Sequence, residues 1–285
     1  MNTERLTEPT VRSSHYSPHT NSAPMTASHG CHKDKTHMSS IKEYYFEKQQ
    51  ENCIAWIREQ YGIEIDPDEP PEAWEDLAGE YSAMLEAEEA EYQWLNRHTH
   101  SEFFLQFANE LATASSLLNV GTSAVHTDTL NKLVYAHIIT LMEALISSVV
   151  RHLIVKDARL LTNLVAGYGK LSAKTITLKE IAEQPKVMES IAQQALSELT
   201  FHNVATIKQI LDAMFAEHMD GLKIAPIARI CSKRHDIVHR NGKTVRDEPI
   251  DLTVEEVRNA MLVVRAFADD LQNRINKALD EGSAL

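Results

Sequence analysis

The chain has 285 residues, of which 43% are hydrophobic and 24% charged, as expected for an ordinary globular protein with one or two domains. Its formal net charge of −13 argues against nonspecific binding of the whole chain to nucleic acid. The N-terminus has no apolar core of a secretory signal, and no run reaches the roughly 18 uncharged apolar residues of a membrane span. With three cysteines and no CxxC spacing, we expect free thiols in a cytoplasmic protein.

Residues 1–38 are rich in Ser, Thr, Pro, Asn and His and have little apolar periodicity. This composition predicts a disordered leader. The leader contains five of the fourteen histidines, but their irregular spacing favours a solvated tail over a metal-binding one.

Residues 39–122 are expected to form an acidic, helical N-terminal segment. One helix is predicted from Ile41 to a stop at Gly62, a second over 71–97, and a third over 101–118. Twelve acidic and no basic residues occur between positions 64 and 91. The helix over 71–97 could mask a basic cleft, although a solvated helix face is the simpler interpretation.

Residues 123–285 are predicted to form a second helical part. A long apolar helix over 128–155 belongs in a bundle core or a dimer interface. The final helix is expected to begin at Thr253, where Thr253 and Glu256 match a capping box. Nothing alternates with period two for long enough to require a sheet, so the predicted fold class is all-α. Further helices are predicted over 157–167, 178–184, 186–198 and 203–217, and from Ala225 to a stop at Asn241-Gly242.

The segment RICSKRHDIVHRNG, residues 229–242, is unusual in this acidic chain. Seven basic residues and one acidic residue occur between positions 222 and 246. Cations are favoured near a helix C-terminus and can lie over apolar surface, so the lysines and arginines could be structural only. That explanation does not account for the two histidines and the aspartate in the same turns.

A metal site is one functional interpretation of this segment. His235 and His239 are four residues apart and share one helix face, and HDIVH resembles the HExxH pattern with Asp236 in place of Glu. A third ligand is required, for which Glu255 and Glu256 are the nearest downstream candidates. The surrounding cations disfavour a divalent ion, and Glu256 already has a capping role.

Phosphate chemistry is the second functional interpretation. A histidine can transfer a proton near neutral pH, and an arginine can hold phosphoryl oxygens. RNA supplies its own nucleophile, the 2′-hydroxyl. Arg234, His235 and His239 therefore provide the groups that an endoribonuclease needs. Arg234 and His239 lie roughly 140° apart around an ideal helix, so a cleft between helices or between two chains would have to bring them together.

Arg234 to His239, RHDIVH, matches the R-x4-H signature of HEPN domains, and the chain resembles this family over about residues 125–280. The order of elements also resembles that of the family: a long apolar helix containing Glu143 comes first, the motif follows late in the chain, and a final long helix comes after it. The resemblance implies a helical bundle of HEPN type, here with an additional N-terminal helical segment. It also implies a homodimer whose motifs line a shared cleft and a metal-independent endoribonuclease without cofactors.

The resemblance also assigns roles by position. Arg234 would hold the scissile phosphate, His239 would act as general acid or base, and His235 would support either role. Glu143 and Asp236 would support the site. The groups expected to contact RNA around it are Lys233, Arg240, Asn241 and Lys243.

The expected function is RNA cleavage by 2′-hydroxyl attack, as in toxin–antitoxin, abortive-infection and antiviral defence systems. The expected partners are RNA, a second copy of the chain and an antitoxin or defence-complex protein, with no membrane. Two alternatives remain open: a noncatalytic HEPN-like module for nucleotide binding or dimerisation, and a metal-dependent hydrolase using HDIVH.

Overall fold

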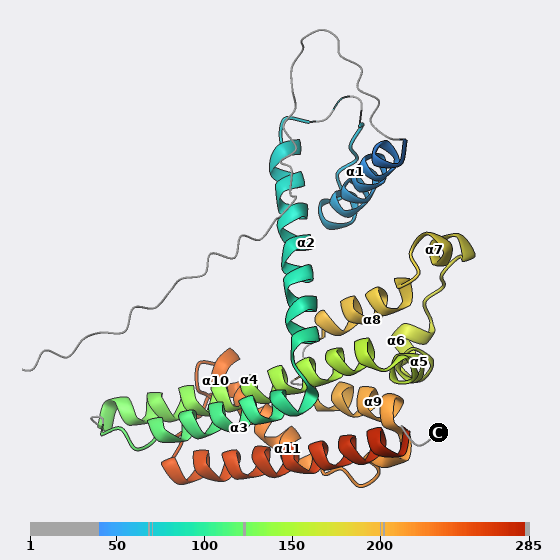
Figure 1. The fold of residues 1–285 in the computed structure, drawn as a ribbon. Helices are drawn as coiled ribbons and strands as arrows, with labels where there is room; N and C mark the ends of the chain where they lie inside the picture. The colour runs from blue at the N-terminus through green and yellow to red at the C-terminus, as the bar shows by residue number, and fades with distance from the viewer. Residues whose placement is uncertain are drawn as a thin grey trace, which may run out of the picture. The chain divides into compact units, whose positions relative to one another are not determined.

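The computed structural model describes residues 40–67, 69, 71–121, 124–199, 201 and 203–282. The described residues form helices and no strand, apart from an isolated bridge between Lys243 and Pro249, which confirms the all-α prediction (Figure 1). The predicted leader lies outside the described residues. The helices are α1 Ser40–Tyr61, α2 Trp74–Arg97, α3 His100–Leu117, α4 Ala124–Lys156, α5 Ala158–Gly167, α6 Gly169–Ser172, α7 Leu178–Glu183, α8 Val187–Ser197, α9 Val204–Phe215, the 3₁₀ turn η1 Ala216–Met219, α10 Ala225–His239 and α11 Val254–Gly282.

The chain divides into two compact units, Met1–Leu77 and Ala78–Leu285. In the first unit, α1 buries Cys53 and Ile57. Gly62 ends α1 with a φ of 67°, a backbone conformation that favours glycine, and its N–H donates to the carbonyl of Arg58 at 2.9 Å. The predicted stop at Gly62 is therefore confirmed.

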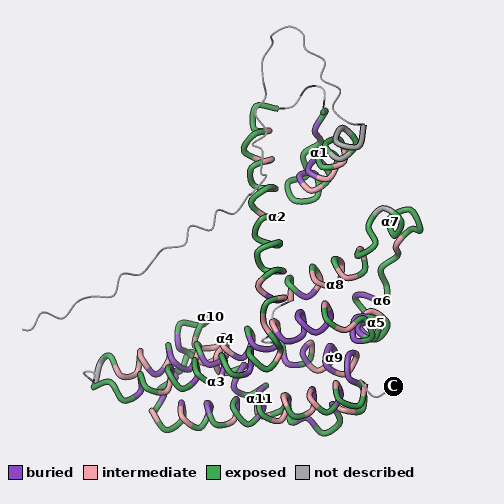
Figure 2. Tube along the Cα trace, in the orientation of Figure 1, coloured by how far each residue is buried: buried purple, intermediate pink, exposed green. Residues whose placement is uncertain are grey.

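The core of the second unit is built around α4. Ile138, Ile139, Met142 and Ile146 of α4 are buried, α4 contacts α3, α10 and α11, and buried positions recur along all of these helices (Figure 2). By length and hydropathy alone, the segment His126–Lys156 could span a membrane, with a mean hydropathy of 1.8 in its most apolar window. Half of that window is buried by protein, as in the core helix of a bundle.

The boundary between the units differs from the one that the sequence suggested. The loop around residue 122 was expected to separate an N-terminal helical segment from the C-terminal part. Instead, α3 packs along α4 and also contacts α11. Phe103, Phe104 and Phe107 of α3 are buried in the same core as α4. The amphipathic pattern of α3 indicated a buried face but not which helices would cover it.

The end of α2 is attached to α4 by a buried histidine. The Nδ1–H of His152 donates to the backbone carbonyl of Leu95 at 2.9 Å. The ring of His152 meets the edge of Phe103 with the centroids 5.8 Å apart. Burial lowers the pKa of His152, an effect opposed mainly by the hydrogen bond to Leu95.

We expect His152 to make the stability of the protein depend on pH. The pKa of His152 is lower in the folded chain than in the unfolded chain, where it is about 6.5. The stability that the neutral His152 contributes is therefore complete above pH 6.5. The free energy of unfolding then falls as the pH is lowered through about 6.5, by up to about 1.4 kcal/mol per pH unit for one proton. Denaturant unfolding between pH 5 and 8 would measure this slope.

The matched variants for this measurement are His152→Gln and His137→Gln, because His137 is an exposed histidine of the same helix. The slope should become shallower in His152→Gln and stay unchanged in His137→Gln. An unchanged slope in both variants would show that other groups account for the pH dependence.

Candidate functional site

The segment that the sequence singled out forms α10 and the turn after it. Pro226 lies in the first turn of the helix, where a missing N–H costs nothing. The apolar side of α10 buries Ile227, Ile230 and Cys231. The helix packs on α4 and α11, with a smaller contact to α9. This packing decides which of the polar side chains of α10 face the core and which face solvent.

Arg234 lies on the inner side of α10, beside Cys231. The side chain is half-buried, and its Nε has no hydrogen-bond partner within the described part of the chain. Glu143 of α4 reaches the same place. Burial and, to a smaller extent, the negative charge of Glu143 raise the pKa of the Cys231 thiol, which the positive charge of Arg234 lowers, and together these effects bring it to about 11. Arg234 and Glu143 therefore flank one buried thiol.

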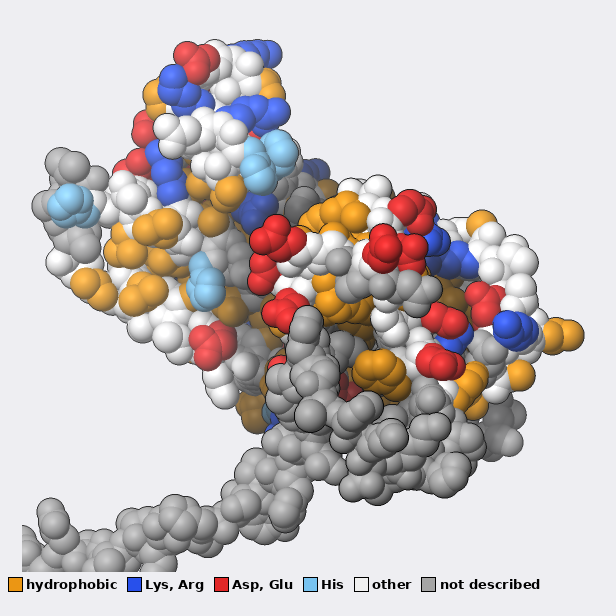
Figure 3. All heavy atoms as spheres, turned by 90° about the horizontal axis from the view of Figure 1, so that it is seen from above, with side chains coloured by type: hydrophobic (Ala, Val, Ile, Leu, Met, Phe, Trp, Pro, Cys, Tyr) orange, Lys and Arg blue, Asp and Glu red, His pale blue; other side chains and the backbone are white. Residues whose placement is uncertain are grey.

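His235 and His239 lie on the outer side of α10. Both are exposed, and their rings lie against each other with centroids 4.7 Å apart at an angle of 42°. Figure 3 draws one face of the molecule, on which histidine side chains lie at several separate places among lysine, arginine and hydrophobic side chains. The structure thus brings the two predicted histidines together.

Arg234 and His239 do not share one face of α10. Arg234 turns toward Cys231 and Glu143, whereas His239 is exposed one turn further on. This agrees with the roughly 140° that separates residues five apart on a helix. One α10 helix alone therefore does not present the two groups to a single phosphate.

The cations expected to contact RNA already have carboxylate partners. Lys233 Nζ lies 3.2 Å from Glu256, and Lys243 Nζ lies 2.8 Å from Asp247. Arg240 forms an ion pair with Asp236. Such surface pairs contribute about 0–1 kcal/mol each, so a phosphate can replace the carboxylate at little cost. Local positive charge is nevertheless smaller than the sequence suggested, because three acids lie among these bases.

The turn after α10 has the backbone that its sequence requires. Asn241 and Gly242 both have positive φ, at 53° and 76°, which confirms the predicted helix stop. A Cβ at Gly242 would lie 3.3 Å from Nζ of Lys132 on α4. Asn241 is exposed at this turn, next to the histidine pair in sequence.

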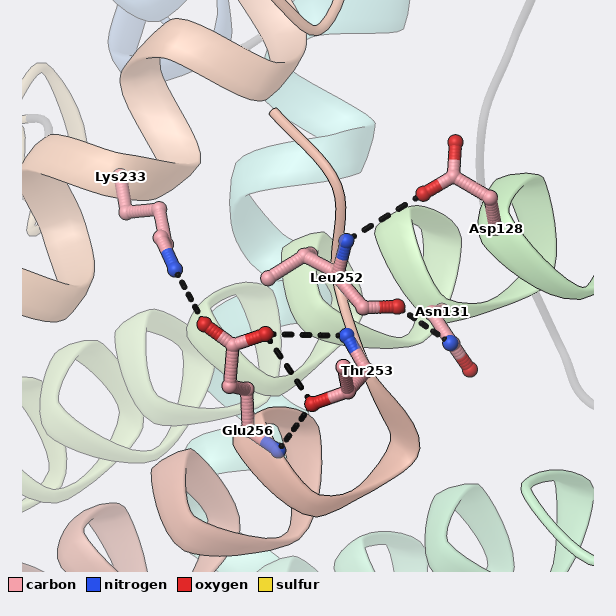
Figure 4. Close-up of polar contacts among 6 residues, drawn as sticks. All are labelled: Asp128, Asn131, Lys233, Leu252, Thr253 and Glu256. Atoms are coloured by element: carbon pink, nitrogen blue, oxygen red, sulfur yellow. Dashed lines mark hydrogen bonds and ion pairs between the residues drawn. The ribbon is translucent and has the colours of Figure 1, made fainter. Parts of the chain in front are cut away.

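The segment that leads from this turn to α11 is fixed to α4. Buried Asn131 donates to the carbonyl of Leu252 at 2.6 Å, and the Leu252 N–H donates to Asp128 at 3.3 Å (Figure 4). The Thr253 N–H donates to the Glu256 carboxylate at 3.0 Å and the Glu256 N–H to the Thr253 hydroxyl at 3.2 Å, which confirms the predicted capping box.

These anchoring residues were not predicted as part of the site. Asn131 could have been noticed as an amide in a run of apolar helix residues, because a buried polar side chain needs a partner. Nothing in the sequence indicated that its partner is Leu252, 121 residues further along the chain.

A metal-ligand set of three residues is not formed at α10. Glu256, one of the two candidates for a third ligand, is engaged by Thr253 and Lys233. Among the residues that the structure describes, no group of three or more His, Cys, Asp or Glu side chains could hold a metal ion. His235 and His239 therefore form a pair rather than part of a larger ligand set.

The charges around Cys231 allow the arrangement of Glu143 and Arg234 to be tested. In Glu143→Gln the thiol pKa should fall below its value of about 11, because a neighbouring negative charge is removed. In Arg234→Ala it should rise, because a positive charge is removed. Thiolate absorbance against pH, in a chain with Cys31 and Cys53 replaced by Ser, would report Cys231 alone. A thiol pKa that responds to neither substitution would contradict this arrangement.

The site therefore consists of an inward arginine flanked by a carboxylate and a thiol, and an outward pair of histidines, on one helix. These groups can bind a phosphate and transfer a proton. Comparison of the chain with protein-family models, curated proteins and solved structures finds no match.

Proposed function

We propose that the protein is a metal-independent endoribonuclease of HEPN type that acts as a homodimer. The observation that carries this proposal is that α10 holds Arg234, whose buried Nε has no hydrogen-bond partner among the described residues, and on another face the exposed pair His235 and His239. A buried charged donor without a partner is costly and uncommon in folded proteins. A phosphate group is a suitable partner for the guanidinium.

The chemistry of the proposed reaction requires a base, an acid and a cation. The RNA 2′-oxygen loses its proton to a histidine and forms a bond to the adjacent phosphorus. The bond from phosphorus to the 5′-oxygen breaks, and that oxygen takes up a proton. The products are a 2′,3′-cyclic phosphate and a 5′-hydroxyl. His239 is the proposed general acid or base, His235 assists it, and Arg234 stabilises the charge that develops on phosphate.

A second copy of the chain is part of this proposal because Arg234 and His239 diverge around α10. The arginine of one copy would work with the histidine of the other. Apolar side chains exposed on α4 and α10 support such a contact: Leu133 of α4 is 64% exposed and Val238 of α10 is 46% exposed. An isologous interface buries the same surface of both copies.

Glu143 is proposed as a positioning residue. It lies beside the same thiol as Arg234, and its carboxylate can hold the guanidinium in place for the phosphate. Asp236 would position Arg240 through their ion pair. Neither carboxylate needs to touch the RNA in this arrangement.

A noncatalytic HEPN-like nucleotide-binding or dimerisation module is the second candidate. The ion pairs Lys233–Glu256, Arg240–Asp236 and Lys243–Asp247 favour it, because they neutralise much of the charge that RNA would meet. Such a module would need Arg234 for binding a phosphate but would need neither histidine for proton transfer.

The test is incubation of the purified chain with mixed RNA in excess EDTA. Cleavage that resists the chelator and leaves 2′,3′-cyclic phosphate ends would support the endoribonuclease. Cleavage that EDTA abolishes would contradict a metal-independent reaction. RNA binding without cleavage would favour the noncatalytic module. Growth arrest on expression in bacteria, relieved by His239→Ala, would support a toxin or defence role in the cytoplasm.

A further inference from the structure

The outward histidine pair has a second chemical property, which is independent of proton transfer. His235 and His239 are on adjacent turns of α10, both are exposed, and their ring centroids are 4.7 Å apart. With a metal–nitrogen distance of about 2.1 Å, two imidazole centroids lie roughly 4.5 Å apart at the right angle of tetragonal Cu²⁺ and roughly 5.3 Å apart at the tetrahedral angle of Zn²⁺. The rings are thus already close to the spacing that one shared metal ion requires.

The cations near this pair do not oppose a metal as strongly as the sequence suggests. Arg240 forms an ion pair with Asp236, and Lys233 lies 3.2 Å from Glu256. Arg234, also in the last two turns of α10, is half-buried and lies near Cys231 and Glu143, whereas both histidines are exposed. The outer side of α10 therefore presents two neutralised cations next to the imidazoles.

We propose that His235 and His239 form a two-ligand site for a divalent transition metal such as Zn²⁺ or Cu²⁺, and that the bound metal inhibits the protein. Imidazole nitrogen suits these ions, whereas Mg²⁺ and Ca²⁺ prefer oxygen. Because no third side-chain donor accompanies the pair within the described residues, water completes the coordination. This is an inhibitory site rather than the centre of a metal-dependent hydrolase.

Inhibition follows from the lone pair that the metal uses. A histidine that donates its nitrogen lone pair to Zn²⁺ cannot accept the proton of the 2′-hydroxyl at that nitrogen. Metal binding stands on the geometry of α10 alone, whereas its inhibitory effect rests on the proposed endoribonuclease function. The two parts can therefore be tested separately.

The binding test uses the full chain with the five leader histidines replaced by Asn, since these could bind metal themselves. Zn²⁺ is titrated in competition with a chromophoric chelator, and Cu²⁺ is followed by electron paramagnetic resonance. We expect one equivalent to bind. His235→Asn and His239→Asn should each weaken Zn²⁺ binding by at least roughly 10-fold. Removal of a group that only supports a metal ligand already costs about that much affinity, and these substitutions remove a ligand itself. The exposed histidine variant His137→Asn is the matched control and should bind normally.

The outcomes separate this inference from the proposed function. Unchanged binding in both variants, or loss in only one of them, would overturn the two-ligand site. Zn²⁺ should inhibit RNA cleavage by the same leader-substituted chain at the concentration that fills the site, and excess EDTA should restore it. Binding without inhibition would overturn the inhibitory half. A chain that binds Zn²⁺ at the pair but never cleaves RNA would refute the endoribonuclease and its inhibition, and would leave the metal site standing.

Discussion

Replacing either Arg234 or His239 by Ala should lower the rate of RNA cleavage by about 10²- to 10⁴-fold. The loss of a general acid or base and the loss of a cation that stabilises transition-state charge each cost a factor of this order. The measurement is the initial rate of cleavage of one defined RNA in EDTA at saturating substrate. His235→Ala should cost less, because His235 only assists His239.

Two matched variants on exposed positions control for general loss of charge. Arg229→Ala removes an exposed arginine from the same helix, and His137→Ala removes an exposed histidine from α4. Both should retain most of the activity, and the melting temperature of every variant should stay close to that of the wild type. If Arg229→Ala were as inactive as Arg234→Ala, the effect would reflect net charge and not a specific phosphate contact.

Mixing two inactive variants should restore about a quarter of the wild-type activity. If Arg234 of one copy works with His239 of the other, a dimer of Arg234→Ala with His239→Ala keeps one intact site of two. Random exchange makes half of the dimers mixed, which gives about a quarter of the activity. The measurement is cleavage after the two variants are unfolded together and refolded.

A site formed within one chain predicts the opposite result, because neither copy in the mixed dimer then has both groups. No recovery of activity, together with mixed dimers detected by native mass spectrometry, would therefore contradict the shared site. Each variant unfolded and refolded alone is the control, and it should stay inactive.

The helix limits were predictable because the residues that start and stop helices act locally. Gly62 and the pair Asn241-Gly242 adopt positive φ, and Thr253 with Glu256 forms the expected capping box. Each of these features depends on a few neighbouring residues. The short helix α6, Gly169–Ser172, was not predicted, because four residues are too few to show a periodic pattern.

The positions of the site's side chains were only partly predictable. Spacing alone placed His235 and His239 on one face and Arg234 away from His239. It did not indicate which helix would cover the apolar face of α10. That helix is α4, whose Glu143 lies near Cys231 and Arg234 although more than eighty residues of the sequence separate it from them. The surroundings of Arg234 are set by the packing of α10 on α4, two helices that are distant in sequence.

The sequence by itself therefore determined the all-α class, the limits of most helices, and the concentration of arginine and histidine on one helix. These properties follow from propensity, capping and periodicity, which act over a few residues. Only the tertiary structure decided that Arg234 turns inward beside Cys231 and that the exposed cations pair with nearby acids. It also decided that Asn131 fixes Leu252 across 121 residues. Such contacts arise when the helices pack, because packing brings together groups that are far apart along the chain.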